Sequence, residues 1–130
     1  MKFKAAVLYE QNKPLVIEEL ETQALGHGQV LVKILYSGVC QTQVNEVKGV
    51  KGPDKYLPHT LGHEASGIVH EIGPGVTRVM PGDYVVLSWI KGPGLEASSS
   101  QYLLGGAKGV SKINSGAITT FNTFSVVSEN

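Results

Sequence analysis

Cysteine, histidine and glutamate, three side chains that zinc accepts as ligands, occur in two short stretches of this sequence. Cys40 stands at the start of a predicted helix, where the helix dipole favours thiolate, the form of cysteine that binds zinc. His63 and Glu64 stand side by side within TLGHEASGIV at 60–69. His63 follows Cys40 by 23 residues, so spacing alone leaves two alternatives open. Either the three side chains meet at a metal, or Cys40 is a small buried hydrophobe and the other two belong to a polar loop.

The other histidines fit structural roles better than metal binding. His59 precedes His63 by four residues, a helical metal-binding spacing, but a proline and a glycine beside them oppose a helix. We therefore predict His59 in a loop and not as a ligand. His70 falls within a predicted strand, where local hydrogen bonds would satisfy it. His27 stands between two glycines and is predicted to lie in a turn.

Glycine and proline punctuate the chain at short intervals, which is typical of an all-β domain. Alternating or continuous apolar runs predict strands, the first two forming a hairpin: 3–10, 15–21, 29–38, 66–73, 83–90 and 118–127. The strand at 83–90 is expected to be largely buried. One short helix is predicted over 41–49, ending at Gly49. The Gly- and Ser-rich stretch 91–116 is predicted to be one long loop, so we expect a β-barrel-like or sandwich domain with this excursion.

Composition excludes several function classes. The 130 residues carry 11 basic and 11 acidic side chains, and this balance indicates neither a nucleic-acid partner nor a membrane surface. No apolar run approaches the roughly 20 residues of a membrane-spanning helix. Cys40 is the single cysteine, so no internal disulfide can form. Without a signal-peptide pattern, the expected location is the cytoplasm.

Three fragments in order carry a family resemblance: GVCQTQ (38–43), LGHEASGIVHEIGPGVTRVMPGDYVV (61–86) and TFNTFSVVSE (120–129). They resemble the medium-chain dehydrogenase/reductase family, in its zinc-dependent alcohol dehydrogenase group with a GroES-like catalytic domain. The resemblance implies a mainly β fold: a GroES-like, partly open β-barrel with one short helix and the long loop.

The resemblance also implies roles for particular residues. Cys40 and His63 would be ligands of a catalytic zinc, and Glu64 would stand behind the metal or enter its shell. Thr42 would be the catalytic hydroxyl that accepts the substrate proton and starts a relay to solvent. Trp89 would be an aromatic wall of the substrate pocket.

The chain also departs from the family pattern. Gln43 stands where the family often has aspartate, so it cannot supply negative charge behind the metal. Asn45 stands where a histidine often continues the proton relay. The loop lacks the four cysteines that hold a structural zinc in many members, so no structural zinc is expected.

The predicted function is that of an oxidoreductase acting on a small-molecule alcohol, aldehyde or ketone with NAD or NADP. Residues 1–130 would be the incomplete catalytic domain, and the remaining ligand and the nucleotide-binding domain would follow Asn130. We therefore expect the chain alone to be inactive, while the intact enzyme could form a homo-oligomer. Two alternatives are a non-catalytic GroES-like binding or assembly module and a zinc-free, quinone-reductase-like member of the superfamily. Those reductases generally lack the cysteine and the histidine that this chain has.

Overall fold

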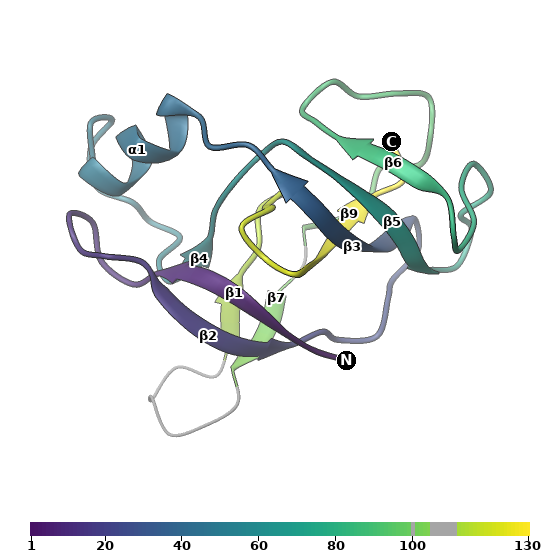
Figure 1. Ribbon diagram of the computed structural model, residues 1–130, viewed down its shortest axis with the longest axis horizontal. Helices are drawn as coiled ribbons and strands as arrows, with labels where there is room; N and C mark the ends of the chain where they lie inside the picture. The colour runs from purple at the N-terminus through teal and green to yellow at the C-terminus, as the bar shows by residue number, and fades with distance from the viewer. Residues whose placement is uncertain (100, 105–111) are drawn as a thin grey trace.

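The computed structural model describes residues 1–99, 101–104 and 112–130, and in these ranges the chain is mainly β with a single helix (Figure 1). In chain order the elements are β1 Lys2–Leu8, β2 Val16–Glu21, β3 Gln29–Ser37, α1 Gln41–Lys48, β4 His59–Thr60, β5 Ala65–Ile72, β6 Tyr84–Leu87, β7 Gln101–Leu104, β8 Lys112–Asn114 and β9 Phe124–Ser128. The predicted mainly β class with one short helix is confirmed, as are the opening hairpin and the helix that ends at Gly49.

Five strands form a closed barrel in the order β1-β2-β7-β8-β4. The short strand β4 completes the ring, because it pairs antiparallel with β1 through Leu8 and His59 and parallel with β8 through His59 and Asn114. The sequence predicted a partly open barrel, and these two contacts of β4 close it.

A second sheet, in the order β6-β5-β3-β9, packs against the barrel. The first half of β3, one of the two inner strands, is buried on both faces: Leu31 points into the barrel core, and Val30 and Val32 point into a second apolar cluster. At Gly67 of β5 the chain passes so close to β3 that an added Cβ would overlap the carbonyl of Lys33. Glycine is therefore required there for the two strands to pair.

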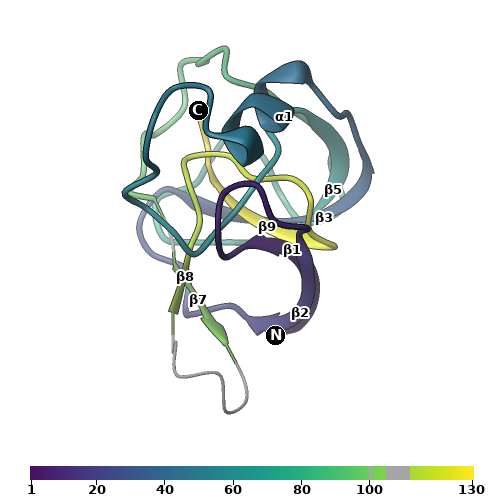
Figure 2. The ribbon, with the colours of Figure 1, turned by 90° about the vertical axis from the view of Figure 1, so that its left-hand side faces the viewer.

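Helix α1 connects β3 to β4 and lies on the opposite side of the molecule from β7 and β8 (Figures 1 and 2). It ends at Gly49 in the left-handed conformation (φ 68°), which glycine adopts without steric cost. The turn between β1 and β2 holds this end, because Asn12 N–H donates to the carbonyl of Val47 at 2.6 Å. The helix is thus fixed to the barrel at its C-terminus.

Two sequence predictions about local structure are wrong. The strand β6 is mostly exposed, since Tyr84 is 79% and Val86 80% accessible and only Leu87 is buried. The stretch 91–116 is not one loop, because it contributes β7 and β8 to the barrel; its residues 100 and 105–111 lie outside the described part. Strands as short as these give too little periodicity to be recognised in a Gly-rich stretch.

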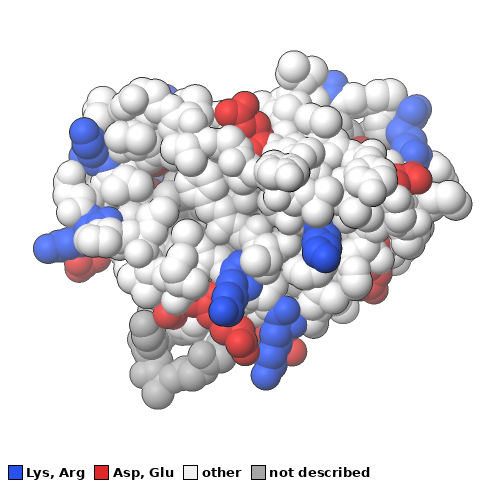
Figure 3. Space-filling model, viewed as in Figure 1, with Lys and Arg blue, Asp and Glu red and all other residues white. Residues whose placement is uncertain are grey.

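Charged side chains of both signs are interspersed on the face shown in Figure 3, many of them near β1 and β2. Within the described ranges no helix is long and apolar enough to cross a membrane.

Candidate functional site

Cys40 occupies the N-cap position of α1, as the sequence predicted, with an extended backbone (φ −111°, ψ 152°). Its thiol is partly exposed. The pKa of this thiol is lowered, chiefly by a hydrogen bond from the backbone N–H of Thr42 and then by the Thr42 hydroxyl, 3.6 Å from Sγ. Burial of the thiol and, after it, the negative charge of Glu64 oppose this lowering of the pKa. Cys40 is thus a thiol whose surroundings favour the thiolate that metals bind.

Gln43 joins Cys40 to His63. Its side chain is buried, its Oε1 accepts the backbone N–H of Cys40 at 2.9 Å, and its Nε2 lies 3.0 Å from Nδ1 of His63. Because Oε1 accepts from a donor, Nε2 is the group that donates to the imidazole. His63 Nδ1 is therefore the acceptor, and a neutral ring in this arrangement carries its proton on Nε2. In the sequence Gln43 is distinguished only by the charge it lacks, and its spacing from His63 gives no signal of this bridge.

The segment that carries His63 and Glu64 turns at Gly62, where φ is +98°. The backbone N–H groups of Thr120 and Phe121 both donate to the Leu61 carbonyl at 2.9 Å. An added Cβ at Gly62 would lie 2.9 Å from the Phe121 ring and would overlap the Thr120 hydroxyl. Glycine therefore allows this turn to pack on the segment before β9.

Glu64 leaves the turn in an exposed position. The backbone N–H of Gly38 donates to its carbonyl at 3.0 Å, which joins this segment to the connection between β3 and α1. Its carboxylate lies against Gly38, where an added Cβ would come within 2.8 Å of Oε1. Glu64 is therefore close to Cys40, in agreement with its opposing effect on the thiol.

Thr42, His63 and Trp89 line one cavity of about 350 Å³. Its other lining residues include Gly62, Ile118 and Thr119. Helix α1, the segment 62–64 (the GHE segment) and the residues that precede and follow the stretch 91–116 therefore meet there. Trp89 is 57% exposed and forms an apolar part of the wall. The structure therefore places the predicted catalytic hydroxyl, one predicted ligand and the predicted aromatic wall around a common space.

The three predicted metal ligands are not the tightest potential ligand set. In the part of the chain that the structure describes, the group whose donor atoms all lie within 4.8 Å of one another is Glu46, Asp54 and His59. Cys40, His63 and Glu64 do not form such a group.

His59 was predicted to lie in a loop, but it is in β4 and is only 8% exposed. Its Nδ1 lies 2.7 Å from the Thr60 carbonyl and its Nε2 lies 2.5 Å from Asp54 Oδ2. Burial raises the pKa of Asp54, but hydrogen bonds from His59 and from the Tyr56 N–H outweigh it, so the net effect is a lowered pKa. Sequence spacing gave no signal for this group, because its members come from a helix, a connecting segment and a strand.

The remaining histidines lie in the predicted secondary structure. His27 is in a turn, as predicted. His70 is exposed on β5, and its ring packs edge-on against Phe124, with centroids 5.3 Å apart.

Comparison with known proteins gives a consistent set of relatives. The sequence profile of the alcohol dehydrogenase GroES-like domain matches residues 26–130. The class-3 alcohol dehydrogenase of Dictyostelium discoideum is 49% identical over 87 residues, which are 67% of this chain and 23% of that protein. The class-3 enzyme of Zea mays is 51% identical over 83 residues, or 64% of this chain and 22% of that protein. The chain thus spans about a quarter of the length of these curated relatives.

Solved structures agree on the fold. A cobalt- and zinc-bound thermostable alcohol dehydrogenase from Pyrobaculum aerophilum matches with a TM-score of 0.68 and 26% identity, over 98% of this chain and 40% of that one. An alcohol dehydrogenase zinc-binding domain protein from Burkholderia ambifaria matches with a TM-score of 0.74 over 100% of this chain and 40% of that one. Its 21% identity supports likeness of fold alone.

Proposed function

This chain belongs to the family of alcohol dehydrogenase GroES-like domains, and we propose that it is the N-terminal part of the catalytic domain of a zinc-dependent alcohol dehydrogenase. In the whole enzyme, an alcohol would be oxidised to an aldehyde or ketone, or the reverse, with hydride exchanged with NAD or NADP. The observation that carries the proposal is the bridge through Gln43, which joins Cys40 to His63. The bridge runs from the backbone N–H of Cys40 to the ring of His63, so it holds the segments that carry these two side chains next to each other.

The chemistry of the donors fits zinc. Cys40 offers a thiol whose pKa is lowered, His63 an imidazole, and Glu64 a carboxylate on the adjacent segment. Cys40 and His63 would hold the ion, and Glu64 would stand beside it. When bound, zinc supplies Lewis-acid chemistry, which polarises an alcohol or carbonyl oxygen. We propose no structural zinc, because Cys40 is the single cysteine of the sequence.

Thr42 would accept the proton that leaves the substrate hydroxyl. Its hydroxyl lines the same cavity as His63 and is within reach of Sγ of Cys40, so a substrate hydroxyl held there could donate to it. A relay through a titratable group does not continue at Asn45, whose amide oxygen accepts from Gln41 Nε2 at 3.1 Å. A proton leaving Thr42 would therefore pass to water in the cavity.

Trp89 would orient the substrate by its apolar surface. The cavity of about 350 Å³ has room for a small alcohol, and Ile118 adds a second apolar side chain to its wall. These contacts favour a small molecule with an apolar portion as the substrate.

Cobalt substitution tests this proposal. Co²⁺ bound to Cys40 should give a thiolate-to-cobalt charge-transfer absorption, which is lost in Cys40→Ser. His63→Gln should weaken the binding by more than the roughly 10–100-fold that follows from replacing a residue behind a ligand, because here a ligand itself is replaced. His70→Gln is the matched control, because His70 is exposed on β5 away from the cavity. Cobalt binding without this absorption, or an affinity read from this absorption that is unchanged in His63→Gln, would refute the proposal and favour a zinc-free or assembly role.

A further inference from the structure

We propose that Glu46, Asp54 and His59 form a second binding site, for a first-row divalent cation such as Zn²⁺. Their donor atoms all lie within 4.8 Å of one another, close enough for a single ion to contact all three. The group is asymmetric in burial: His59 is buried, Asp54 is partly buried and Glu46 is exposed. An ion there would have a buried imidazole behind it and a side open to solvent.

The hydrogen bonds of His59 set the orientation of its ring. A carbonyl oxygen only accepts, so Nδ1 must carry a proton that it donates to the Thr60 carbonyl at 2.7 Å. Nε2, 2.5 Å from Asp54 Oδ2, then faces a carboxylate with its lone pair unless a positive charge lies between them. At this distance a proton lies between the two atoms, and a metal ion bound by both would displace that proton and move the two groups apart. Metal-ligating histidines usually make this arrangement, with the other ring nitrogen donating to a backbone carbonyl.

Glu46 favours the metal over the proton. One carboxylate completes an ion pair with a protonated histidine, so a second carboxylate adds negative charge that the pair does not need. Among the described residues, Glu46 forms no side-chain hydrogen bond or ion pair, although Lys51 and Lys55 line the neighbouring cavity. Two carboxylates and a neutral imidazole instead match the charge of a divalent cation.

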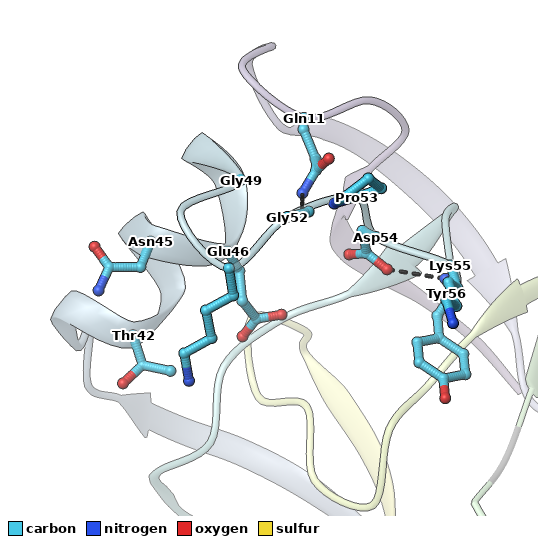
Figure 4. A pocket seen from close by; sticks show the side chains of 11 residues that line it. Gln11, Thr42, Asn45, Glu46, Gly49, Gly52, Pro53, Asp54, Lys55 and Tyr56 are labelled. Carbon is cyan, nitrogen blue, oxygen red and sulfur yellow. Dashed lines mark hydrogen bonds between the residues drawn. The ribbon is translucent and has the colours of Figure 1, made fainter.

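The three donors are held by separate parts of the fold. Glu46 projects from α1, and Figure 4 shows its carboxylate directed toward the segment that carries Asp54. Asp54 is fixed because its Oδ1 accepts the Tyr56 N–H at 2.9 Å. His59 is fixed by the pairing of β4 with β1 and β8. The structure therefore holds the three side chains near one another, and binding would require only that His59 and Asp54 separate slightly.

Space for entry and for water ligands is present on two sides. Glu46 and Asp54 line both the cavity of about 350 Å³ that contains His63 and a neighbouring one of about 270 Å³ (Figure 4). The mixed nitrogen and oxygen donors favour Zn²⁺, Mn²⁺ or another first-row ion over Mg²⁺, which prefers an all-oxygen shell. Glu46, Asp54 and His59 have no role in the proposed function, so the second site and the catalytic zinc site can be tested independently.

The experiment uses Cys40→Ser as the starting protein, so that the proposed catalytic site does not contribute. Calorimetric titration with Zn²⁺ should show one remaining site, for which Mg²⁺ does not compete. Adding Glu46→Gln should weaken it at least tenfold, and adding Asp54→Asn should abolish it. Asparagine can still accept the Tyr56 N–H and donate to Nε2 of His59, so this variant should stay folded. Glu71→Gln, an equal charge change at an exposed position of β5, should leave the affinity unchanged.

Ring nitrogen chemical shifts give a second readout. Without zinc, the ¹⁵N signals of His59 should report a proton on Nδ1, and zinc should shift the Nε2 signal without losing the Nδ1 proton. Two results would overturn the proposal. One is that Cys40→Ser binds no zinc, and the other is that adding Glu46→Gln or Asp54→Asn leaves the zinc affinity of Cys40→Ser unchanged. The contact between His59 and Asp54 would then be a hydrogen bond that stabilises the closed barrel.

Discussion

Replacing Gln43 by glutamate tests how the bridge between Cys40 and His63 controls metal affinity. In the wild type, Oε1 is occupied by the Cys40 N–H, and the amide Nε2 donates to His63 Nδ1. A zinc ion on Nε2 of His63 needs the ring proton on Nδ1, where it would face the amide donor. Glutamate has nearly the same shape but two acceptor oxygens, so it could accept from both Cys40 N–H and His63 Nδ1–H.

The size of the effect follows from these contacts. Gln43 is only 3% exposed, so the new contact would be a buried hydrogen bond to a charged group. Such bonds contribute about 1.5–3 kcal/mol, which corresponds to roughly 10–150-fold in affinity. We expect Gln43→Glu to bind zinc more tightly than the wild type by about this factor, because the carboxylate also offsets part of the ion's charge.

Competition with a chromophoric chelator measures the zinc affinity at the cysteine site. The matched control is Gln41→Glu, which adds the same charge at an exposed position in the first turn of α1. Both variants should be compared in an Asp54→Asn background, so that the second proposed site does not contribute. If Gln43→Glu and Gln41→Glu raise the zinc affinity equally, the increase comes from the added negative charge acting at long range. The proposed role of the Gln43 amide is then wrong. A decrease in Gln43→Glu would equally refute it.

Three further predictions concern other contacts. Gly67→Ala should lower the free energy of unfolding by about 1–3 kcal/mol, because the added Cβ would overlap the backbone of Lys33. Urea denaturation measures this loss. Gly26→Ala is the control, because its added Cβ would make only an ordinary contact at 3.4 Å. Cys40, whose thiol pKa is lowered, should be alkylated by iodoacetamide at a pH where an ordinary thiol is slow, and Thr42→Val should shift the rate profile to higher pH. The carboxylate of Glu129 accepts backbone N–H groups of residues 77, 78 and 95, and these outweigh burial, so its pKa is lowered. Glu129→Gln should therefore lower the urea midpoint at neutral pH, and the difference from wild type should vanish as the pH falls below the ordinary carboxyl range; a constant difference would contradict this.

The local sequence pattern was sufficient to predict the longer strands and the helix. The opening hairpin, β3, β5 and the helix ending at Gly49 each have enough residues to show a period or a stop signal, and the structure confirms them. It was insufficient for β4, β7 and β8, which have two to four residues each and exist because neighbouring strands supply their hydrogen bonds. The predicted burial of β6 failed for a related reason, since an apolar run shows that a strand forms but not which of its faces is covered.

The sequence by itself determined the family, the β class and the types of side chain available for chemistry. The turn glycines and the GHE segment are local features of the chain, so they can be read from the sequence without knowing the fold. Only the tertiary structure decided which donors are neighbours. Gln43 reaches His63 across 20 positions of sequence, and His59 meets Asp54 and Glu46 only after β4 pairs with β1 and β8. Such contacts depend on how strands far apart in the chain pair and pack, and that pairing is a property of the whole domain, which no single stretch of residues encodes.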